Sequence, residues 1–145
     1  MPTYLNPTLL LTSTAGSTGT SEDASLVLSV TDQLIVTDPS IGISRIACTT
    51  TGGATIILPS GTATRFLYIK NIGFDADDVA TTAHLKVETG DGARLIELAA
   101  DEFCWLPYKN EAGGIIQLEA SATLPDGATA SSGTIIAEYG YWTKY

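Results

Sequence analysis

Hydrophobic and polar residues alternate with a period of two along most of the chain, which is the spacing of β-strands. In residues 114–122, Ile116, Leu118 and Ala120 are predicted to face inward, and the polar residues between and after them, up to Ser121, outward. This arrangement is typical of a strand with one face on a core and one face in solvent.

The segment 65–70 differs because its central positions are all apolar. Phe66 and Tyr68 fall on one face of the predicted strand, and Leu67 and Ile69 fall on the other. A strand that is apolar on both faces is typical of the middle of a packed sheet.

Eight more segments have strand character, and turn-forming residues such as Gly90-Asp91-Gly92 and Pro125-Asp126-Gly127 separate them. The segments are residues 25–30, 33–37, 43–50, 54–59, 85–89, 94–99, 102–108 and 134–142. Residues 93–102 alone admit a helical interpretation, and their apolar spacing fits a strand better. The Asp-Gly step at 91–92 predicts a tight hairpin. About ten short strands predict an all-β protein, namely an antiparallel β-sandwich, jelly roll or small barrel.

The first residues of the chain break this pattern. Leu9, Leu10 and Leu11 form one apolar cluster among Thr, Ser, Gly and Pro, and residues 12–21 have no large apolar side chain to add to a core. We therefore predict an extended N-terminal arm in residues 1–24 and a single β-sandwich domain in residues 25–145. The arm is either a frayed terminus or a segment that orders on a partner.

Aromatic residues gather at the other end of the chain, where four of the eleven occupy the last seven positions. Tyr and Trp are enriched in interfaces, but a last strand that closes a sheet would also use them. The two interpretations are compatible. The candidate interface residues from both ends of the chain are Tyr4, Leu9, Leu10, Leu11, Tyr139, Tyr141, Trp142 and Tyr145.

The chain has 145 residues, enough for one domain, and its 16 acidic and 7 basic residues give a net charge of -9. The basic residues are scattered singly, which argues against binding to nucleic acid or an anionic membrane. There is no apolar run long enough to span a membrane and no secretory signal, so we expect a soluble protein made in the cytoplasm. With so few charges to protect sheet edges, a homo-oligomer is expected, with a trimer as one candidate.

No residue pattern indicates an enzyme. The only histidine, His84, has no second histidine to help it hold a metal, and no nucleophile-elbow or phosphate-loop motif is present. Asp75, Asp77 and Asp78 could collect around a calcium ion, but a solvated acidic loop is the better interpretation because the EF-hand glycine and glutamate are missing. We expect no cofactor.

The two cysteines, Cys48 and Cys104, lie in apolar strand-like segments. We expect two reduced thiols that behave as small core hydrophobes. Whether they lie close enough to pair depends on the tertiary structure.

The segments 55–61, 65–73, 98–107, 115–120 and 137–140 together resemble small virion proteins of tailed bacteriophages. The shared features are an Asn-x-Gly turn after a strand, a Phe-x-x-Leu-Pro strand and a closing Tyr-Gly strand, across roughly residues 54–142. The resemblance is greatest to capsid decoration (cement) proteins. It implies a non-enzymatic protein that is made in the host cytoplasm, binds the major capsid protein on the outside of the virion and stabilises the lattice.

Two alternatives remain open at this stage. Tail, neck and fibre-associated structural proteins share the same sequence features. A carbohydrate- or receptor-binding β-sandwich would instead use Trp105, Tyr108, Tyr141 and Trp142 as a stacking platform.

Overall fold

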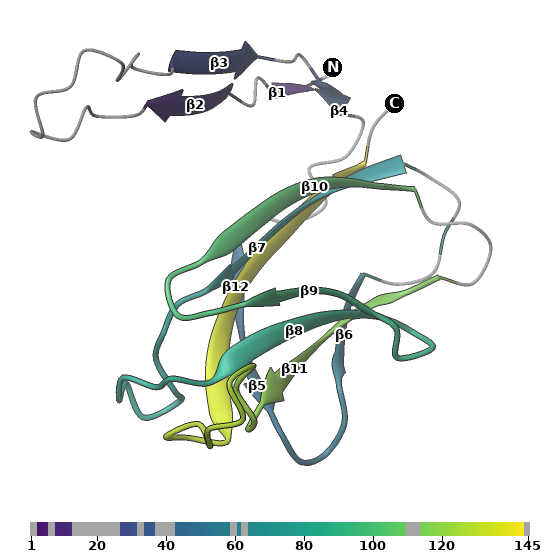
Figure 1. The fold of residues 1–145 in the computed structure, drawn as a ribbon. Helices are drawn as coiled ribbons and strands as arrows, with labels where there is room; N and C mark the ends of the chain where they lie inside the picture. The colour runs from purple at the N-terminus through teal and green to yellow at the C-terminus, as the bar shows by residue number, and fades with distance from the viewer. Residues whose placement is uncertain are drawn as a thin grey trace, which may run out of the picture.

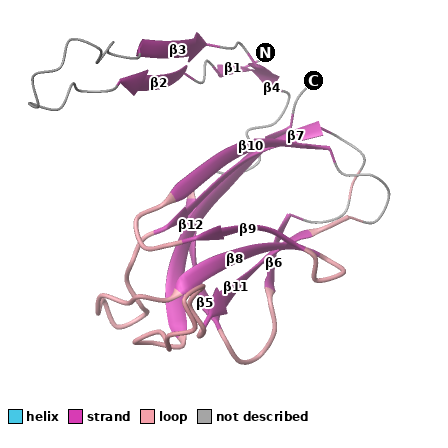
Figure 2. Cartoon of the chain, in the orientation of Figure 1, coloured by secondary structure: helices cyan, strands magenta, loops and turns pink. Residues whose placement is uncertain are grey.

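The computed structural model describes residues 3–5, 8–12, 27–31, 34–36, 43–58, 61, 64–109 and 114–143. Within these residues the chain forms only strands and loops, and no helix is present that could cross a membrane (Figure 2). The all-β prediction is confirmed. The strands are β1 (Thr3–Leu5), β2 (Thr8–Thr12), β3 (Val27–Thr31), β4 (Leu34–Val36), β5 (Ser44–Thr49), β6 (Thr55–Leu58), β7 (Thr64–Asn71), β8 (His84–Thr89), β9 (Arg94–Leu98), β10 (Phe103–Lys109), β11 (Ile116–Ser121) and β12 (Thr134–Thr143).

Eight of these strands form two antiparallel sheets that pack face to face as a β-sandwich (Figure 1). Sheet 1 has the strand order β10-β7-β12-β5, and sheet 2 has the order β6-β11-β8-β9. Among consecutive strands from β5 to β12, β8 and β9 alone are neighbours in one sheet. They form the predicted hairpin, which the Thr89 N–H to Ala93 carbonyl bond (2.9 Å) closes, and Gly92 has the positive φ of +83° that this turn needs. The remaining connections cross between the sheets and tie them together.

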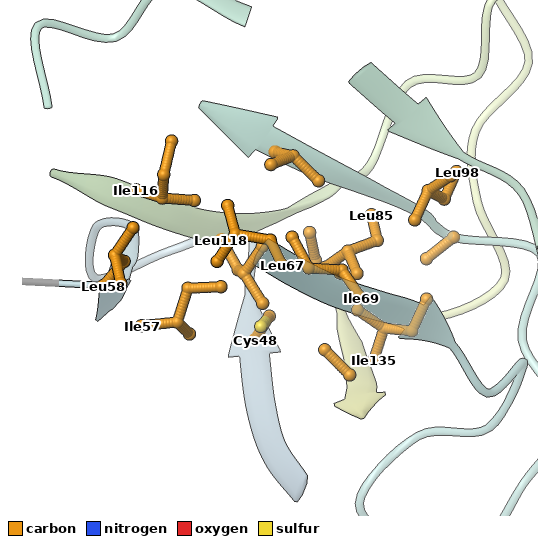
Figure 3. Close-up of a cluster of buried hydrophobic side chains, with 14 residues drawn as sticks. Cys48, Ile57, Leu58, Leu67, Ile69, Leu85, Leu98, Ile116, Leu118 and Ile135 are labelled. Carbon is orange, nitrogen blue, oxygen red and sulfur yellow. The ribbon is translucent and has the colours of Figure 1, made fainter. Parts of the chain in front are cut away.

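The hydrophobic core lies between the two sheets and follows the predicted alternation (Figure 3). On β7, Leu67 and Ile69 are buried, and on β11, Ile116 and Leu118 are buried opposite them. Ser121, predicted to face solvent, is also buried, and its hydroxyl is satisfied there because it donates to the Thr123 carbonyl (2.7 Å) where the chain leaves β11. The core is mainly aliphatic and also contains Cys48, which is fully buried on β5.

Asn71, at the end of β7, is a fully buried polar residue that joins the two sheets. Its Nδ2 donates to the carbonyl oxygens of Ala83 (3.1 Å) and Leu98 (3.0 Å), and its Oδ1 accepts from the Gly73 N–H (2.9 Å). Both side-chain N–H groups and the carbonyl oxygen therefore have partners, which is the condition for burying an amide without a large penalty.

Two loops at one end of the sandwich have the same construction. Residues 74–80 connect β7 to β8, and residues 123–129 connect β11 to β12; an isolated β-bridge closes each loop. The two loops are joined by reciprocal bonds between Thr82 and Ser131, in which the Thr82 N–H donates to Ser131 Oγ (3.0 Å) and the Ser131 N–H donates to Thr82 Oγ1 (3.1 Å). Equivalent positions in the loops, Asp78 and Gly127, have φ values of +62° and +84°.

This equivalence predicts how position 127 responds to substitution. Open space surrounds a Cβ at Gly127, so Gly127→Ala should cost only backbone strain, about 1 kcal/mol of unfolding free energy. Gly127→Asp should cost less, because Asp tolerates a positive φ and already occupies the equivalent position 78. Urea denaturation of the two variants tests this order. A larger loss for Gly127→Asp would mean that the two loops are not equivalent.

The N-terminal strands lie outside the two sheets. β1 pairs with β4, and β2 pairs with β3, in separate two-stranded ladders (Figure 1). β1 and β2 belong to the predicted arm, and their partners lie after the predicted domain boundary at residue 25. Residues 13–26 fall outside the described residues, and the sandwich itself begins with β5.

Candidate binding surface

The outer face of sheet 1 carries a cluster of aromatic side chains, which we call the aromatic face. Successive residues of a strand point to opposite faces, so the residues that alternate with the core residues of β10, β7 and β12 lie on the outside. The register sets them side by side, with Trp105 opposite Tyr68 and Trp142 opposite Phe66. The aromatic face consists of Phe66, Tyr68, Phe103, Trp105 and Trp142.

The rings of the aromatic face contact one another. The centroids of Trp105 and Trp142 are 5.1 Å apart, those of Phe66 and Trp105 are 6.0 Å apart, and those of Tyr68 and Phe103 are 6.5 Å apart. Phe103 nevertheless remains 62% exposed and Trp105 38% exposed. Contiguous exposed apolar surface of this kind is typical of a binding site.

Gly140 makes room for one of these rings. It lies on β12 opposite Tyr68, and a Cβ at this position would be 3.1 Å from Cη2 of Trp142. The Trp142 indole therefore lies over the Gly140 backbone, and a side chain at position 140 would push it away. The closing Tyr-Gly segment of the sequence thus has a packing function on the aromatic face.

A polar cluster borders the aromatic rings. Glu138 on β12 accepts from Tyr68 Oη (3.1 Å) with one carboxylate oxygen and from Arg45 Nε (3.2 Å) with the other. Partial burial, followed by the hydrogen bond from its hydroxyl to Glu138, raises the pKa of Tyr68. These bonds hold Tyr68 in place and leave Arg45 largely exposed, with 65% of its side chain accessible.

The outer face of sheet 1, which contains the aromatic face, is more basic than the chain as a whole. By strand alternation Arg45, Lys70 and Lys109 lie on the outer face of sheet 1, with Glu138 as the acidic residue among the described strand residues there. The full chain has a net charge of -9. This face is therefore suited to an acidic partner surface.

The outer face of sheet 2 has a different character, because each of its described basic residues contacts a carboxylate. Lys86 contacts Glu119 (3.3 Å), His84 Nδ1 contacts Glu97 (3.3 Å), and Arg94 also contacts Glu97 (2.5 Å). A hollow of about 470 Å³ beside this network is lined in part by Lys86, Arg94, Glu97 and Glu119. Its basic groups are already neutralised by carboxylates, so it offers little attraction for a charged ligand.

The acidic loop at 75–78 is organised by its own backbone. One carboxylate oxygen of Asp75 accepts from the N–H groups of Asp77 and Val79, both at 3.0 Å. In the part of the chain that the structure describes, no three His, Cys, Asp or Glu side chains are grouped so that they could hold a metal ion. The Asp75 carboxylate shapes a turn.

The two cysteines are free and far apart. Cys48 is on β5 and Cys104 on β10, the two edge strands of sheet 1, with β12 and β7 between them. Three strand spacings amount to about 14 Å, twice the Cα separation of about 7 Å that a disulfide tolerates. Burial raises the pKa of the Cys48 thiol to about 12 and that of Cys104 to about 11.

The interface residues predicted from the sequence do not share one surface in the structure. Trp142 lies on the aromatic face, whereas Tyr139 and Tyr141 lie on the opposite face of β12 and pack against the core. Leu9 and Leu10 are exposed on β2, at 49% and 60%. Tyr145 and the side chains of Tyr4 and Leu11 lie outside the described residues.

The four aromatic residues predicted to form a carbohydrate-stacking platform lie on two different faces of sheet 1. Trp105 and Trp142 are in contact on the aromatic face, but Tyr108 and Tyr141 pack against the core. Phe66 and Phe103 take part instead. The apolar outer side of segment 65–70 is the sequence signal for this face, but a strand with two apolar faces predicts burial within a packed sheet. In the described chain neighbouring aromatic rings contact its outer side, and no second sheet covers it.

Comparison with known proteins adds no relative: no protein-family model, no curated protein and no solved structure matches this chain.

Proposed function

We propose that this protein is a non-enzymatic structural component of a tailed-phage virion, which binds the outside of the capsid and stabilises it. The observation that carries the proposal is the aromatic face, an exposed apolar surface with basic residues around it on an otherwise acidic β-sandwich. The sequence resemblance to capsid decoration proteins supports the same assignment. On this proposal the aromatic face is the capsid-binding surface and an acidic patch of the major capsid protein is its partner.

The physical properties of the sandwich suit this function. Trp and Tyr side chains bury a large area at a low cost in conformational entropy, and they dominate many interfaces. A rigid sheet holds the five rings in place before binding, which reduces the ordering cost further. On a closed shell, many weak contacts add up through avidity. The net charge of -9 makes binding to the packaged DNA unfavourable, because both carry negative charge.

The proposal predicts that binding to phage heads depends on the aromatic face. Labelled protein is added to heads of the source phage that lack it, and bound protein is measured after sedimentation. Phe103→Ser should reduce the affinity at least tenfold, because it removes the most exposed ring of the face. Leu95→Ser is the matched control, since Leu95 is an exposed hydrophobic residue (44%) on sheet 2, and it should bind normally.

Immunogold labelling of intact virions completes this experiment. Regular label over the head supports the capsid assignment. Label confined to the tail overturns it in favour of a tail, neck or fibre-associated protein. Equal loss of binding in Phe103→Ser and Leu95→Ser would contradict the aromatic face as the binding surface.

Carbohydrate binding is the second candidate function, and contact between Trp105 and Trp142 favours it. Adjacent exposed rings can stack on sugar rings, and the Arg45–Glu138 pair could hydrogen-bond to hydroxyl groups. Titration of the tryptophan fluorescence with oligosaccharides distinguishes the two functions. A saturable shift that Trp105→Ser abolishes, together with no binding to heads, would replace the capsid proposal.

A further inference from the structure

β10 is an edge strand of sheet 1, and the register shows which of its backbone groups point away from the sheet. Where its ladder with β7 begins, the Asn71 N–H donates to the Glu102 carbonyl (3.0 Å). Bonding direction alternates along an antiparallel ladder, so Cys104 bonds toward β7, and the N–H and C=O groups of Phe103 and Trp105 point to the free edge. Among the described strands, none pairs with that edge.

Pro107 occupies another of these outward positions. Proline has no N–H, so within a sheet it is confined to positions that need not donate to a neighbouring strand. Pro107 follows Trp105 by two residues, and the pairing of β10 with β7 continues past it to Lys109. β10 therefore accepts proline where the backbone faces outward, and Phe103 and Trp105 form the half of the edge that keeps its N–H donors.

β10 is also incompletely covered on both of its faces. On the outer face, Phe103 is 62% exposed and Trp105 is 38% exposed. On the inner face, its apolar residues are all only partly buried, whereas each of the other three edge strands has a core residue that is no more than 5% exposed. The partly buried residues of β10 are Cys104, Leu106 and Tyr108, and the buried residues of β5, β6 and β9 are Cys48, Leu58 and Leu98. An apolar strand with a free edge is a template for a further strand.

The charges along β10 indicate which strand fits. Asp101 and Glu102 are exposed just before the strand begins, and Lys109 is exposed where it ends. Two copies of β10 that run antiparallel bring the acidic start of each strand toward the basic end of the other. A two-fold axis relates such a pair, so this charge match occurs twice. A parallel pair would instead bring like charges together.

We propose that this protein self-associates through β10, which pairs antiparallel with β10 of a second copy and joins the two copies of sheet 1 into one continuous sheet. With Cys104 at the two-fold axis, Phe103 lies opposite Trp105 of the partner subunit, and their outward N–H and C=O groups bond to each other. Aromatic cross-strand pairs of this kind stabilise antiparallel ladders. The pairing covers the ring that is most exposed in the single chain.

This self-association goes beyond the proposed capsid binding and is compatible with it. Neighbouring strands of one sheet present corresponding faces on the same side, so the two aromatic faces of the pair lie next to each other. A pair of copies could then bind a capsid lattice at two points, with a gain in avidity. The test of self-association uses the isolated protein and needs no phage heads, so its result does not depend on the capsid assignment.

The experiment measures the mass of the full-length protein by sedimentation equilibrium across a concentration series. The wild-type chain should have the mass of a dimer. Trp105→Pro removes an outward N–H and a ring while it leaves the bonds to β7 in place, and it should raise the dissociation constant at least a hundredfold. Trp105→Ser removes the ring but keeps the N–H, and its effect should be clearly smaller.

Ala47→Pro is the matched control on β5, the opposite edge of sheet 1. Thr50 N–H donates to the Gly133 carbonyl (2.9 Å), so by alternation the backbone of Ala47, like that of Trp105, points to a free edge. Ala47 is exposed, and the substitution should leave the mass unchanged. Urea denaturation shows that each variant is folded.

Lys109→Glu tests the charge match without changing the backbone of β10. It should raise the dissociation constant about tenfold at low salt, and the effect should fade at high salt, because the charges are exposed. This variant keeps the proposal testable if Trp105→Pro does not fold.

Other outcomes overturn the proposal. A wild-type chain that stays monomeric at high micromolar concentration excludes self-association. A dimer that survives both Trp105→Pro and Lys109→Glu must form through another surface. Equal effects of Trp105→Pro and Ala47→Pro contradict the assignment to β10. Equal effects of Trp105→Pro and Trp105→Ser would mean that the ring, and not strand pairing, holds the two copies together.

Discussion

Asn71→Leu should lower the unfolding free energy by about 3–5 kcal/mol, although leucine has the same branched shape and number of side-chain heavy atoms and the site is fully buried. The substitution removes three hydrogen bonds at once and leaves the carbonyl oxygens of Ala83 and Leu98 and the N–H of Gly73 without the side-chain partner. Urea denaturation, with circular dichroism as the probe, measures the loss.

Asn71→Asp refines this prediction because it keeps the shape and changes the charge. A buried carboxylate cannot donate to two carbonyl oxygens, and burial should raise its pKa above the unfolded value of about 3.9. A raised folded pKa gives a contribution to stability that is present at low pH and lost as the pH rises through that pKa. The unfolding free energy of Asn71→Asp should therefore rise relative to that of Asn71→Leu as the pH is lowered from 7 to 5.

Asp126→Ala is the control for position 71. The Asp126 carboxylate also accepts from a backbone N–H in a loop between the sheets, that of Ala128 at 2.9 Å, but it is exposed. Water can replace it, so the cost should stay near or below about 1 kcal/mol. Comparable losses in Asn71→Leu and Asp126→Ala would contradict a special role for the buried amide.

The second large effect concerns the thiols. At pH 8, Cys48 with a pKa of about 12 should have about 1,000-fold less thiolate than a cysteine at the usual value of 9.0, and Cys104 with a pKa of about 11 about 100-fold less. Since the thiolate is the reactive form, alkylation of the native protein by iodoacetamide should be slow at both sites, with Cys104 reacting first. Mass spectrometry of quenched samples follows each site, and the urea-unfolded chain supplies the reference rates.

The same pKa values predict a loss of stability in alkali. Both thiols have folded pKa values above 9.0, so unfolding favours ionisation. Their contribution to stability is complete below pH 9 and falls as the pH rises from 9 toward 12. The decrease between pH 8 and pH 10 should be smaller in Cys48→Ala than in the wild type. Rapid alkylation of native Cys48 would show that the core around β5 opens readily.

The aromatic face shows why a periodic pattern leaves the function open. Segment 65–70 has two apolar sides, and alternation alone cannot distinguish a side that packs against sheet 2 from one that a partner covers. The choice depends on which strands lie beside β7. The pairing with β10 and β12, which places Trp105 and Trp142 next to Phe66, is long-range information.

The alternation of apolar and polar residues does not predict β1 and β2, for a related reason. Leu9, Leu10 and Leu11 lack alternation, and Pro7 and the small polar residues around them are typical of a loop. β2 exists because β3 pairs with it across an intervening segment, and neither strand specifies that register alone.

The sequence by itself determined the all-β class, the ten strands from β3 to β12 within a few residues and the hairpin at Gly90-Asp91-Gly92. These follow from alternation and turn chemistry, which act between neighbours along the chain. Tertiary structure alone decided the separation of Cys48 from Cys104, the burial of Asn71 and the outward position of the aromatic rings. Each of these depends on strand order across a sheet, which distant hydrophobic contacts select and local residue patterns do not encode.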